Sequence, residues 1–241
     1  MKIPELVGES EWSSVTDQGR PFVVYKFAAT LDGRIAAADG TSQWITSAES
    51  RKEVHLLRAG CHATVVGSGT QQADNPNLAV RGNDDPRLDL SMLTPDRQPW
   101  RVVVDTNART PPDAAVLNEA APTMIAVAID ADTTHLEGRA TILRIPRGPR
   151  GLDVKVLLKE LRGHGVKAGF LEGGPTLAGS FVATRVVDRV ISYIAPALLG
   201  EGKPGLVGAD IFTMADILRL DVVDVARIGS DVRIIARPIF G

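Results

Sequence analysis

The chain has 241 residues, of which 44% are hydrophobic, so it is long enough for one large α/β domain or two small ones. Its formal net charge of −2 leaves no basic surplus for nucleic acid, and its single cysteine excludes an internal disulfide and a CxxC site. The four histidines are scattered without acidic neighbours at ligand spacing, so we expect no bound metal. The start of the chain has no apolar signal segment and no run approaches the length of a membrane span, which predicts a cytoplasmic protein.

The first half of the chain begins with a polar segment, residues 1–20, that we interpret as an N-terminal arm packing on a surface or on a partner chain. The ordered domain is expected to start at Pro21, and residues 22–30 form an apolar, β-branched and aromatic run typical of a strand buried on both faces. Residues 46–49, Thr-Ser-Ala-Glu, fit a capping box, which predicts a helix from there to about Gly60.

The middle of the chain alternates short apolar runs with helical or loop segments. Residues 153–163 repeat apolar side chains at helical spacing, which predicts an amphipathic helix, and residues 82–99 are rich in acids and prolines, which predicts a loop. The alternation favours a largely parallel sheet covered on both faces. The expected strands of this part are 63–66, 101–105, 122–128 and 141–145.

The last third of the chain changes character. Residues 186–195, 219–228 and 231–238 are strand-like, and Gly229-Ser230 is a suitable tight turn between the last two. The sequence therefore predicts one α/β domain over residues 21–241, with a mixed, mostly parallel sheet, helices on both faces and a C-terminal antiparallel hairpin.

Residues 170–180 are the most informative stretch. A buried strand runs into Gly173 and Gly174 and then into a helix whose first turn holds Pro175 and Thr176, so free backbone N–H groups face outward at the strand end. A similar turn, Gly67-Ser68-Gly69-Thr70, follows the strand at 63–66, and two such turns side by side could grip the two ends of a dinucleotide. Neither matches the Rossmann spacing, so ordinary tight turns remain an alternative.

Five segments together resemble a known family. They are residues 25–36, 40–46, 57–59, 73–81 and 172–177, and in this order they resemble the reductase domain of riboflavin biosynthesis, the RibD C-terminal family, which has a dihydrofolate-reductase-like fold. The resemblance covers about residues 21–200. It implies NADPH-dependent reduction of 5-amino-6-(5-phosphoribosylamino)uracil to the ribitylamino product, in a protein that usually forms a homodimer.

The resemblance also assigns site residues by position. Lys26 and Asp74 match polar groups at the reacting sugar, and together with Glu172 they are the candidate catalytic residues. The positions that match cofactor contacts are Ala28, Trp44, Thr70, Asp74, Gly173, Gly174, Pro175, Thr176, Leu177, Ala178, Gly179 and Ser180. The positions that match substrate contacts are Ser42, Arg58, Leu78, Arg81 and Glu172.

The chemistry calls for such residues independently. Opening the sugar ring and reducing its imine needs proton transfer near C1′, for which Lys26, Asp74 and Glu172 are suited, and two arginines could hold a phosphate in forked hydrogen bonds. Each has a simpler alternative. Arg58 could lie on a solvated helix face, Trp44 could be core, and Asp74 could cap a turn. A lysine within the apolar run 22–30 is costly to bury without a partner, which favours a functional role for Lys26.

Other functions stay open on the sequence alone. A reductase of another pterin- or pyrimidine-like substrate, dihydrofolate included, and a non-catalytic nucleotide-binding protein both fit the same turns. The H-x-E and P-C-x-x-C signature of the zinc deaminase often fused to this family does not occur, which predicts a stand-alone reductase. The apolar C-terminal strands, with Phe212 and Ile217 between them, are a candidate dimer interface. From the resemblance we also expect a cis peptide bond between Gly173 and Gly174.

Overall fold

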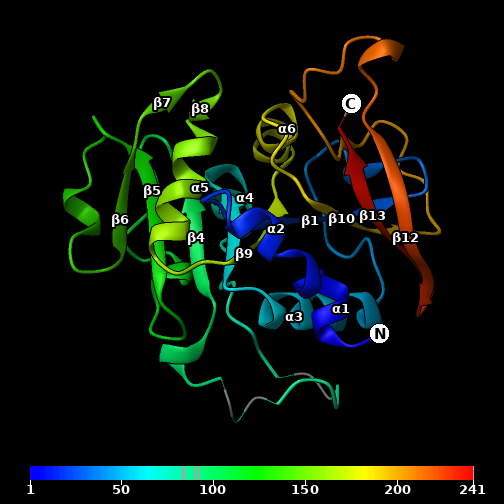
Figure 1. The fold of residues 1–241 in the computed structure, drawn as a ribbon, viewed down its shortest axis with the longest axis horizontal. Coiled ribbons are helices and arrows are strands. Elements are labelled where there is room, and N and C mark those ends of the chain that lie inside the picture. The colour runs from blue at the N-terminus through cyan, green and yellow to red at the C-terminus, as the bar shows by residue number, and fades with distance from the viewer. Residues whose placement is uncertain (83–84, 90, 92, 241) are drawn as a thin grey trace.

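The computed structural model describes residues 1–82, 85–89, 91 and 93–240, which form one nine-stranded sheet with helices on its two faces (Figure 1). The strand order is β12-β13-β10-β1-β9-β3-β4-β5-β6, with β6 at one end of the sheet and β12 at the other. The strands from β10 to β6 are all parallel, and β13 and β12 complete the sheet as antiparallel strands. The predicted mostly parallel sheet with a C-terminal hairpin is confirmed.

The strands of this sheet lie close to the predicted ranges. Their bounds are β1 Phe22–Thr30, β3 Ala63–Gly67, β4 Trp100–Val104, β5 Thr123–Ala128, β6 Thr141–Ile145, β9 Ala168–Gly173, β10 Arg189–Ala195, β12 Arg219–Ile228 and β13 Asp231–Ile239. Two small ribbons stand outside it, β2 Arg34–Ala36 with β11 Lys203–Pro204 and β7 Arg147–Gly148 with β8 Gly151–Leu152.

Strand β10 is shorter than predicted. Residues 186–188 do not pair, because the Val186 N–H bonds back to the Phe181 carbonyl and the Asp188 carboxylate accepts the N–H of Val23 at 2.8 Å. Pairing with β1 therefore starts at Arg189, which lies opposite Val24.

The two faces of the sheet follow from alternation along β1. Val23 and Tyr25 point into an apolar cluster shared with helices α5, Val154–Gly163, and α6, Pro175–Ala183. Phe22 and Val24 point into a second cluster on the opposite face, shared with helix α3, Ala48–Gly60. The apolar first half of β1 is thus buried on both sides of the sheet, as its composition predicts.

The start of α3 differs from the prediction. The N-cap is Ser47, whose Oγ accepts the Ser50 N–H at 3.2 Å, and not Thr46, so the expected capping box of residues 46–49 is wrong. The reason lies outside the local sequence. The carboxylate of Asp231, at the tip of the C-terminal hairpin, accepts the Ser47 N–H at 2.8 Å and the Ser50 hydroxyl at 2.6 Å. A tertiary contact fixes where the helix begins.

The N-terminal segment forms short helices, α1 Ile3–Val7 and α2 Ser13–Thr16, with the 3₁₀ turn Glu9–Glu11 between them. Its apolar side chains Leu6, Val7 and Trp12 are buried in the cluster under α3. At Gly60 an added Cβ would lie 2.6 Å from the Ile3 side chain, so α1 packs directly on α3. The segment predicted as an arm therefore packs on its own chain.

The described part of residues 82–99 holds the 3₁₀ turn Pro95–Arg97 and no strand, in agreement with a loop. Short helix α4, Ser68–Asp74, follows β3 directly and carries Asp74 at its end. In the described ranges, no helix is long and apolar enough to cross a membrane.

Candidate active site

A pocket of about 620 Å³ lies at the carboxyl ends of β1, β3, β4 and β9, where ligands bind in open parallel sheets. It gathers most of the residues that the sequence predicts for the site. Those that line it are Lys26, Ala28, Ser42, Trp44, Thr70, Asp74, Glu172, Gly173, Gly174, Pro175, Thr176, Leu177 and Ser180.

The two glycine turns meet at the floor of this pocket. A Cβ added to Gly174 would lie 3.1 Å from Oγ1 of Thr70, and one added to Gly67 would lie 3.5 Å from Cβ of Leu177. The bond between Gly173 and Gly174 is cis, as expected. Gly174 caps α6 without any side-chain hydrogen bond, so the N-terminal N–H groups of a nine-residue helix face the pocket.

Glu172, the last residue of β9 before the glycines, is held by Arg58 of α3. Arg58 donates from Nε to Oε1 and from Nη2 to Oε2 of the carboxylate, both at 2.7 Å, and both side chains are about 90% buried. Burial raises the pKa of Glu172, but Arg58 and the nearby Lys26 outweigh it and hold that pKa below its ordinary value. Glu172 is therefore ionised at neutral pH.

Lys26 lies midway along β1 and points into the pocket. Burial lowers the pKa of Lys26, and the positive charge of Arg58 lowers it further. The negative charge of Glu172 raises the pKa but does not restore the ordinary lysine value. Its Nζ also lies 6.0 Å from the ring centroid of Tyr193. Asp74 shifts the other way, since burial raises its pKa. Lys26 and Asp74 both lose some of their preference for the charged form, which suits groups that exchange protons.

The remaining predicted substrate residues lie beside the pocket and do not line it. Arg58 is occupied by Glu172 and also donates to the Ala79 carbonyl at 3.4 Å. Leu78 is buried, and Arg81 is exposed, with its N–H donated to Nδ1 of His55 at 3.2 Å. Of the cofactor loop, Ala178 is fully buried and Gly179 packs against Val207.

Two simpler interpretations fail. Arg58 does not lie on a solvated face, because only 12% of its side chain is exposed. Trp44 is not a core residue, since it is 71% exposed at the pocket. The guanidinium of Arg51 stacks over the Trp44 ring, 4.4 Å from its centroid, and Arg51 also donates a hydrogen bond to the Thr46 carbonyl.

The sequence did not single out several residues of this pocket. Arg51, Arg150 and Lys203 bring positive charge to it, and Thr106 adds a hydroxyl after β4. No motif marks them, because each stands in a turn, a helix or a small ribbon that only the tertiary fold brings to the pocket. In the part of the chain that the structure describes, no group of three or more His, Cys, Asp or Glu could hold a metal ion.

The pocket suits a dinucleotide. Two glycine turns and a helix N-terminus that no side chain caps offer backbone donors for a pyrophosphate, and Lys26 and Glu172 lie on the β1 and β9 side of those turns. The fold and this site fit the class of α/β oxidoreductases that bind a dinucleotide cofactor.

The particular family follows from comparison with known proteins. The model of the RibD C-terminal domain matches residues 21–234, and the chain belongs to that family. It is 40% identical over 217 residues to the 2,5-diamino-6-ribosylamino-4(3H)-pyrimidinone 5′-phosphate reductase of Methanothermobacter thermautotrophicus, covering 88% of this chain and 95% of that protein. It is 37% identical over 220 residues to the riboflavin biosynthesis protein RibD of Escherichia coli, covering 89% of this chain and 59% of the other.

Solved structures agree. The structure of Acinetobacter baumannii RibD, form 2, superposes with a TM-score of 0.81 at 30% identity, over 94% of this chain and 60% of that one. The chain thus spans about half to 60% of the length of the RibD proteins it matches, and nearly all of the Methanothermobacter reductase.

Proposed function

We propose that this protein reduces the ribosyl group of a 5′-phosphorylated ribosylamino-pyrimidine to a ribityl group, with NADPH as hydride donor, in riboflavin biosynthesis. The observation that carries the proposal is the grouping of Lys26, Asp74 and Glu172 around one pocket that also holds both glycine turns. A protein that only binds nucleotides has no need of three titratable side chains there.

The residues of the chain divide the work as follows. Bound NADPH supplies the hydride that adds to C1′ of the substrate. Lys26 and Asp74, with pKa values shifted toward neutral pH, carry protons to and from the sugar oxygen and the amine nitrogen as the ring opens. Glu172 is a fixed anion that stabilises the positive charge of the protonated imine.

This assignment narrows the role of Glu172. A carboxylate bound by both arms of Arg58 has no free proton to give at neutral pH. We therefore place Glu172 as an electrostatic group, and assign the proton transfers to Lys26 and Asp74.

Two pyrimidines are candidates for the substrate. The resemblance to RibD indicates 5-amino-6-(5-phosphoribosylamino)uracil. The reductase from Methanothermobacter is named for a 2,5-diaminopyrimidinone, and its 40% identity over 95% of its length favours that compound as the second candidate. The two differ in the group at one position of the ring, so the reducing chemistry at C1′ is the same for both.

An assay of NADPH oxidation decides among these substrates. The purified chain is incubated with the uracil compound, the diaminopyrimidinone or dihydrofolate at equal concentration, and loss of the reduced nicotinamide absorbance is followed. We expect turnover with at least one ribosylamino-pyrimidine and none with dihydrofolate. Turnover of dihydrofolate alone would replace the proposal with a folate reductase.

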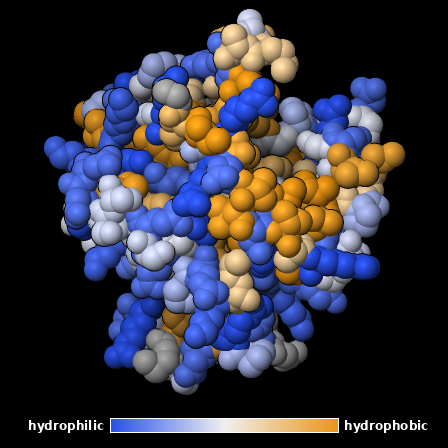
Figure 2. Space-filling model, turned by 45° about the vertical axis from the view of Figure 1, so that its right-hand side comes forward, coloured by the Kyte–Doolittle hydropathy of each residue, from blue (hydrophilic) through white to orange (hydrophobic). Residues whose placement is uncertain are grey.

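We also propose that the protein works as a homodimer in the cytoplasm. Figure 2 shows a broad hydrophobic area on the face that carries the C-terminal strands. The exposed apolar side chains of the C-terminal hairpin include Val222, Val225 and Val232, and Phe212 in the segment between β11 and β12 is exposed as well. A second copy that covers this face would also protect the free edge of β12 from unwanted strand pairing.

A further inference from the structure

Arg150 borders the pocket and forms an ion pair that the reaction described above does not use. It stands in the turn between β7 and β8, and one Nη group donates to the Asp210 carboxylate. Their side chains are 36% and 46% exposed, so solvent reaches both partners. An ion pair this exposed contributes little to stability and is readily exchanged for another partner.

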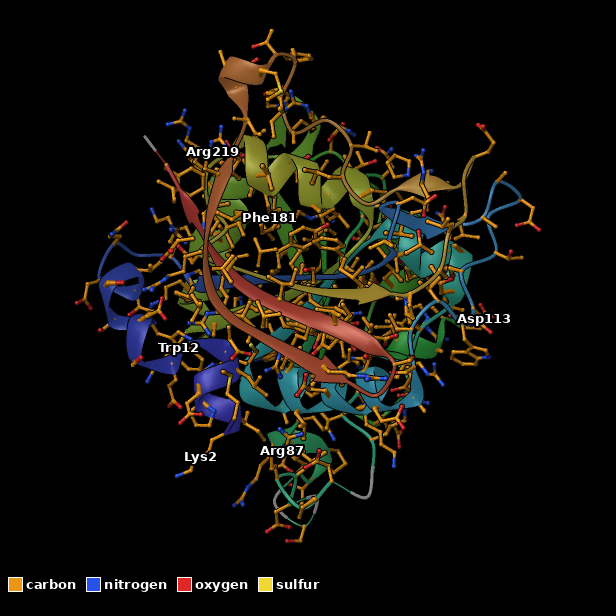
Figure 3. The ribbon with its side chains drawn as sticks, turned by 90° about the vertical axis from the view of Figure 1, so that its right-hand side faces the viewer. Lys2, Trp12, Arg87, Asp113, Phe181 and Arg219 are labelled. Atoms are coloured by element: carbon orange, nitrogen blue, oxygen red, sulfur yellow. The ribbon has the colours of Figure 1, made fainter. Side chains whose placement is uncertain are left out.

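Asp210 comes from the loop that follows β11 and crosses α6 (Figure 3). The Val207 N–H donates to the Pro175 carbonyl at 3.2 Å, and a Cβ at Gly179 would lie only 1.8 Å from the Val207 carbonyl oxygen. The loop is therefore fixed on the first turns of α6. This contact brings Asp210 to Arg150 at the edge of the glycine turns.

The position of Arg150 separates it from the reacting end of the pocket. Gly151, its neighbour in the chain, would place a Cβ 2.9 Å from Oγ1 of Thr106, which follows β4. Lys26 and Glu172 lie on β1 and β9, on the other side of β3. The pocket wall near Arg150 is apolar, formed by Val104, Leu152, Val154 and Leu157.

The other cations of the described lining lie elsewhere. Arg51 stacks on Trp44, and Lys203 lies close to Gly40, where an added Cβ would be 3.2 Å from its Nζ. Among the described residues that line the pocket, Arg150 is the cation on its β4 side and is available to a phosphate group.

We propose that Arg150 exchanges Asp210 for a phosphate group of the dinucleotide, either the pyrophosphate or the 2′-phosphate. This inference rests on the cofactor part of the proposed function. A guanidinium binds phosphate oxygens in a two-pronged, charge-assisted arrangement, which is stronger than an exposed pair with one carboxylate. Asp210 then acts as a stand-in anion that competes with the cofactor.

The test uses the fact that two substitutions remove the same ion pair. Binding of NADPH and of NADH is measured by titrating their fluorescence, without any pyrimidine substrate, for Arg150→Gln, Asp210→Asn and the wild type. Arg150→Gln is expected to weaken NADPH binding roughly tenfold to a hundredfold, the range for a lost charge-assisted hydrogen bond. Asp210→Asn is expected to strengthen NADPH binding about twofold to fivefold, since the competing carboxylate is gone.

Arg147→Gln is the matched control. Arg147 belongs to the same small ribbon and pairs with Asp130 at 3.1 Å, but it does not line the pocket. Its substitution is expected to leave both dinucleotide affinities within about twofold of the wild type, because an exposed pair is worth little.

The measurement with NADH shows which phosphate group Arg150 binds. If Arg150→Gln weakens NADPH alone, Arg150 binds the 2′-phosphate; if it weakens both dinucleotides equally, Arg150 binds the pyrophosphate. The proposal is overturned if the Arg150→Gln variant binds NADPH as tightly as the wild type does. It is also overturned if both substitutions weaken NADPH binding, because the ion pair would then only stabilise the local structure. A wild-type protein that binds neither dinucleotide would overturn the cofactor assignment itself, and this inference with it.

Discussion

Arg58 of α3 and Glu172 of β9 form a two-point ion pair, with Nε–Oε1 and Nη2–Oε2 distances of 2.7 Å. The pair joins the helix that covers one face of the sheet to the strand end that opens the pocket. It keeps the carboxylate ionised and fixes its direction. It also occupies the Arg58 guanidinium, which the sequence predicts as a candidate ligand for the substrate phosphate. The site thus contains a preset negative charge beside Lys26.

Glu172→Gln keeps the size of the side chain but removes that charge. We expect kcat to fall by roughly a hundredfold or more, because electrostatic stabilisation of the cationic imine is lost. NADPH affinity, measured by fluorescence titration, should change less than about threefold, since the backbone of the glycine turns binds the cofactor.

Glu160→Gln, an exposed substitution on α5, serves as the control and should leave kcat unchanged. A thermal unfolding curve for each variant separates lost chemistry from lost fold. Full activity in a folded Glu172→Gln variant would show that the charge has no part in the reaction.

A double-mutant cycle tests the pair as a structural unit. Arg58→Leu leaves Glu172 charged and unpartnered at a largely buried position, which costs about 3–5 kcal/mol of unfolding free energy. Adding Glu172→Leu removes the stranded charge, so the double variant should be more stable than Arg58→Leu alone. Urea unfolding measures all four proteins, and additive losses would mean that the two side chains do not interact.

Sequence patterns predicted those parts of the site that depend on local structure. The double glycine between a buried strand and a helix is visible in residues 170–180, and the cost of a lysine within β1 already favours a function for Lys26. Which groups pair across the fold could not be predicted in this way. The partners of Arg58 and Arg150 come from positions 114 and 60 residues away, and no local pattern encodes such a distance.

The same reason explains the errors in element boundaries. Thr46 has the better capping-box spacing, but the carboxylate of Asp231 binds at Ser47, 184 residues away in sequence. Strand β10 begins late because Asp188 bonds across to β1. At both element boundaries, a hydrogen bond to a carboxylate from a distant part of the chain overrides the local sequence propensity.

His55 gives the folding stability a defined pH dependence. Burial lowers its pKa from 6.5 to about 4, with Arg58 and Arg81 adding to the effect, and its neutral Nδ1 accepts the Arg81 N–H. Between pH 6.5 and 4 the unfolded chain binds a proton at this site and the folded chain does not, so stability is fully present above pH 6.5 and falls as pH drops toward 4. The full shift corresponds to about 3 kcal/mol, which partial solvent exposure reduces to roughly 1–2 kcal/mol.

His55→Asn retains an acceptor near the Nδ1 position and does not titrate. The unfolding free energy of each protein is measured in urea at pH 7 and at pH 4.5. The loss between the two pH values should be about 1–2 kcal/mol smaller for the variant than for the wild type. Parallel pH profiles for the two proteins would show that His55 does not contribute.

Asp231 ties the tip of the C-terminal hairpin to the start of α3, with its carboxylate fully buried. Asp231→Ala removes the two hydrogen bonds to α3 and a third from the Ser230 hydroxyl, and it should lower the unfolding free energy by about 2–4 kcal/mol. Asp221→Ala, on the exposed part of the same hairpin, should change it by less than about 0.5 kcal/mol. Equal effects of the two substitutions would mean that the Asp231 contacts do not stabilise the fold.

The exposed apolar face of the C-terminal strands gives the prediction on assembly. Val225, on edge strand β12, is 60% exposed, and Val222 beside it is 57% exposed. Val225→Asp places a charge in the middle of this face, and a charge buried in a dimer interface without a partner costs several kcal/mol. We expect sedimentation equilibrium to find a wild-type dimer and a Val225→Asp monomer at micromolar concentration. Lys159→Asp introduces the same residue on the exposed side of α5 and should leave the dimer intact. A dimer that survives Val225→Asp would place the interface elsewhere, and a wild-type monomer would mean that this face has another partner.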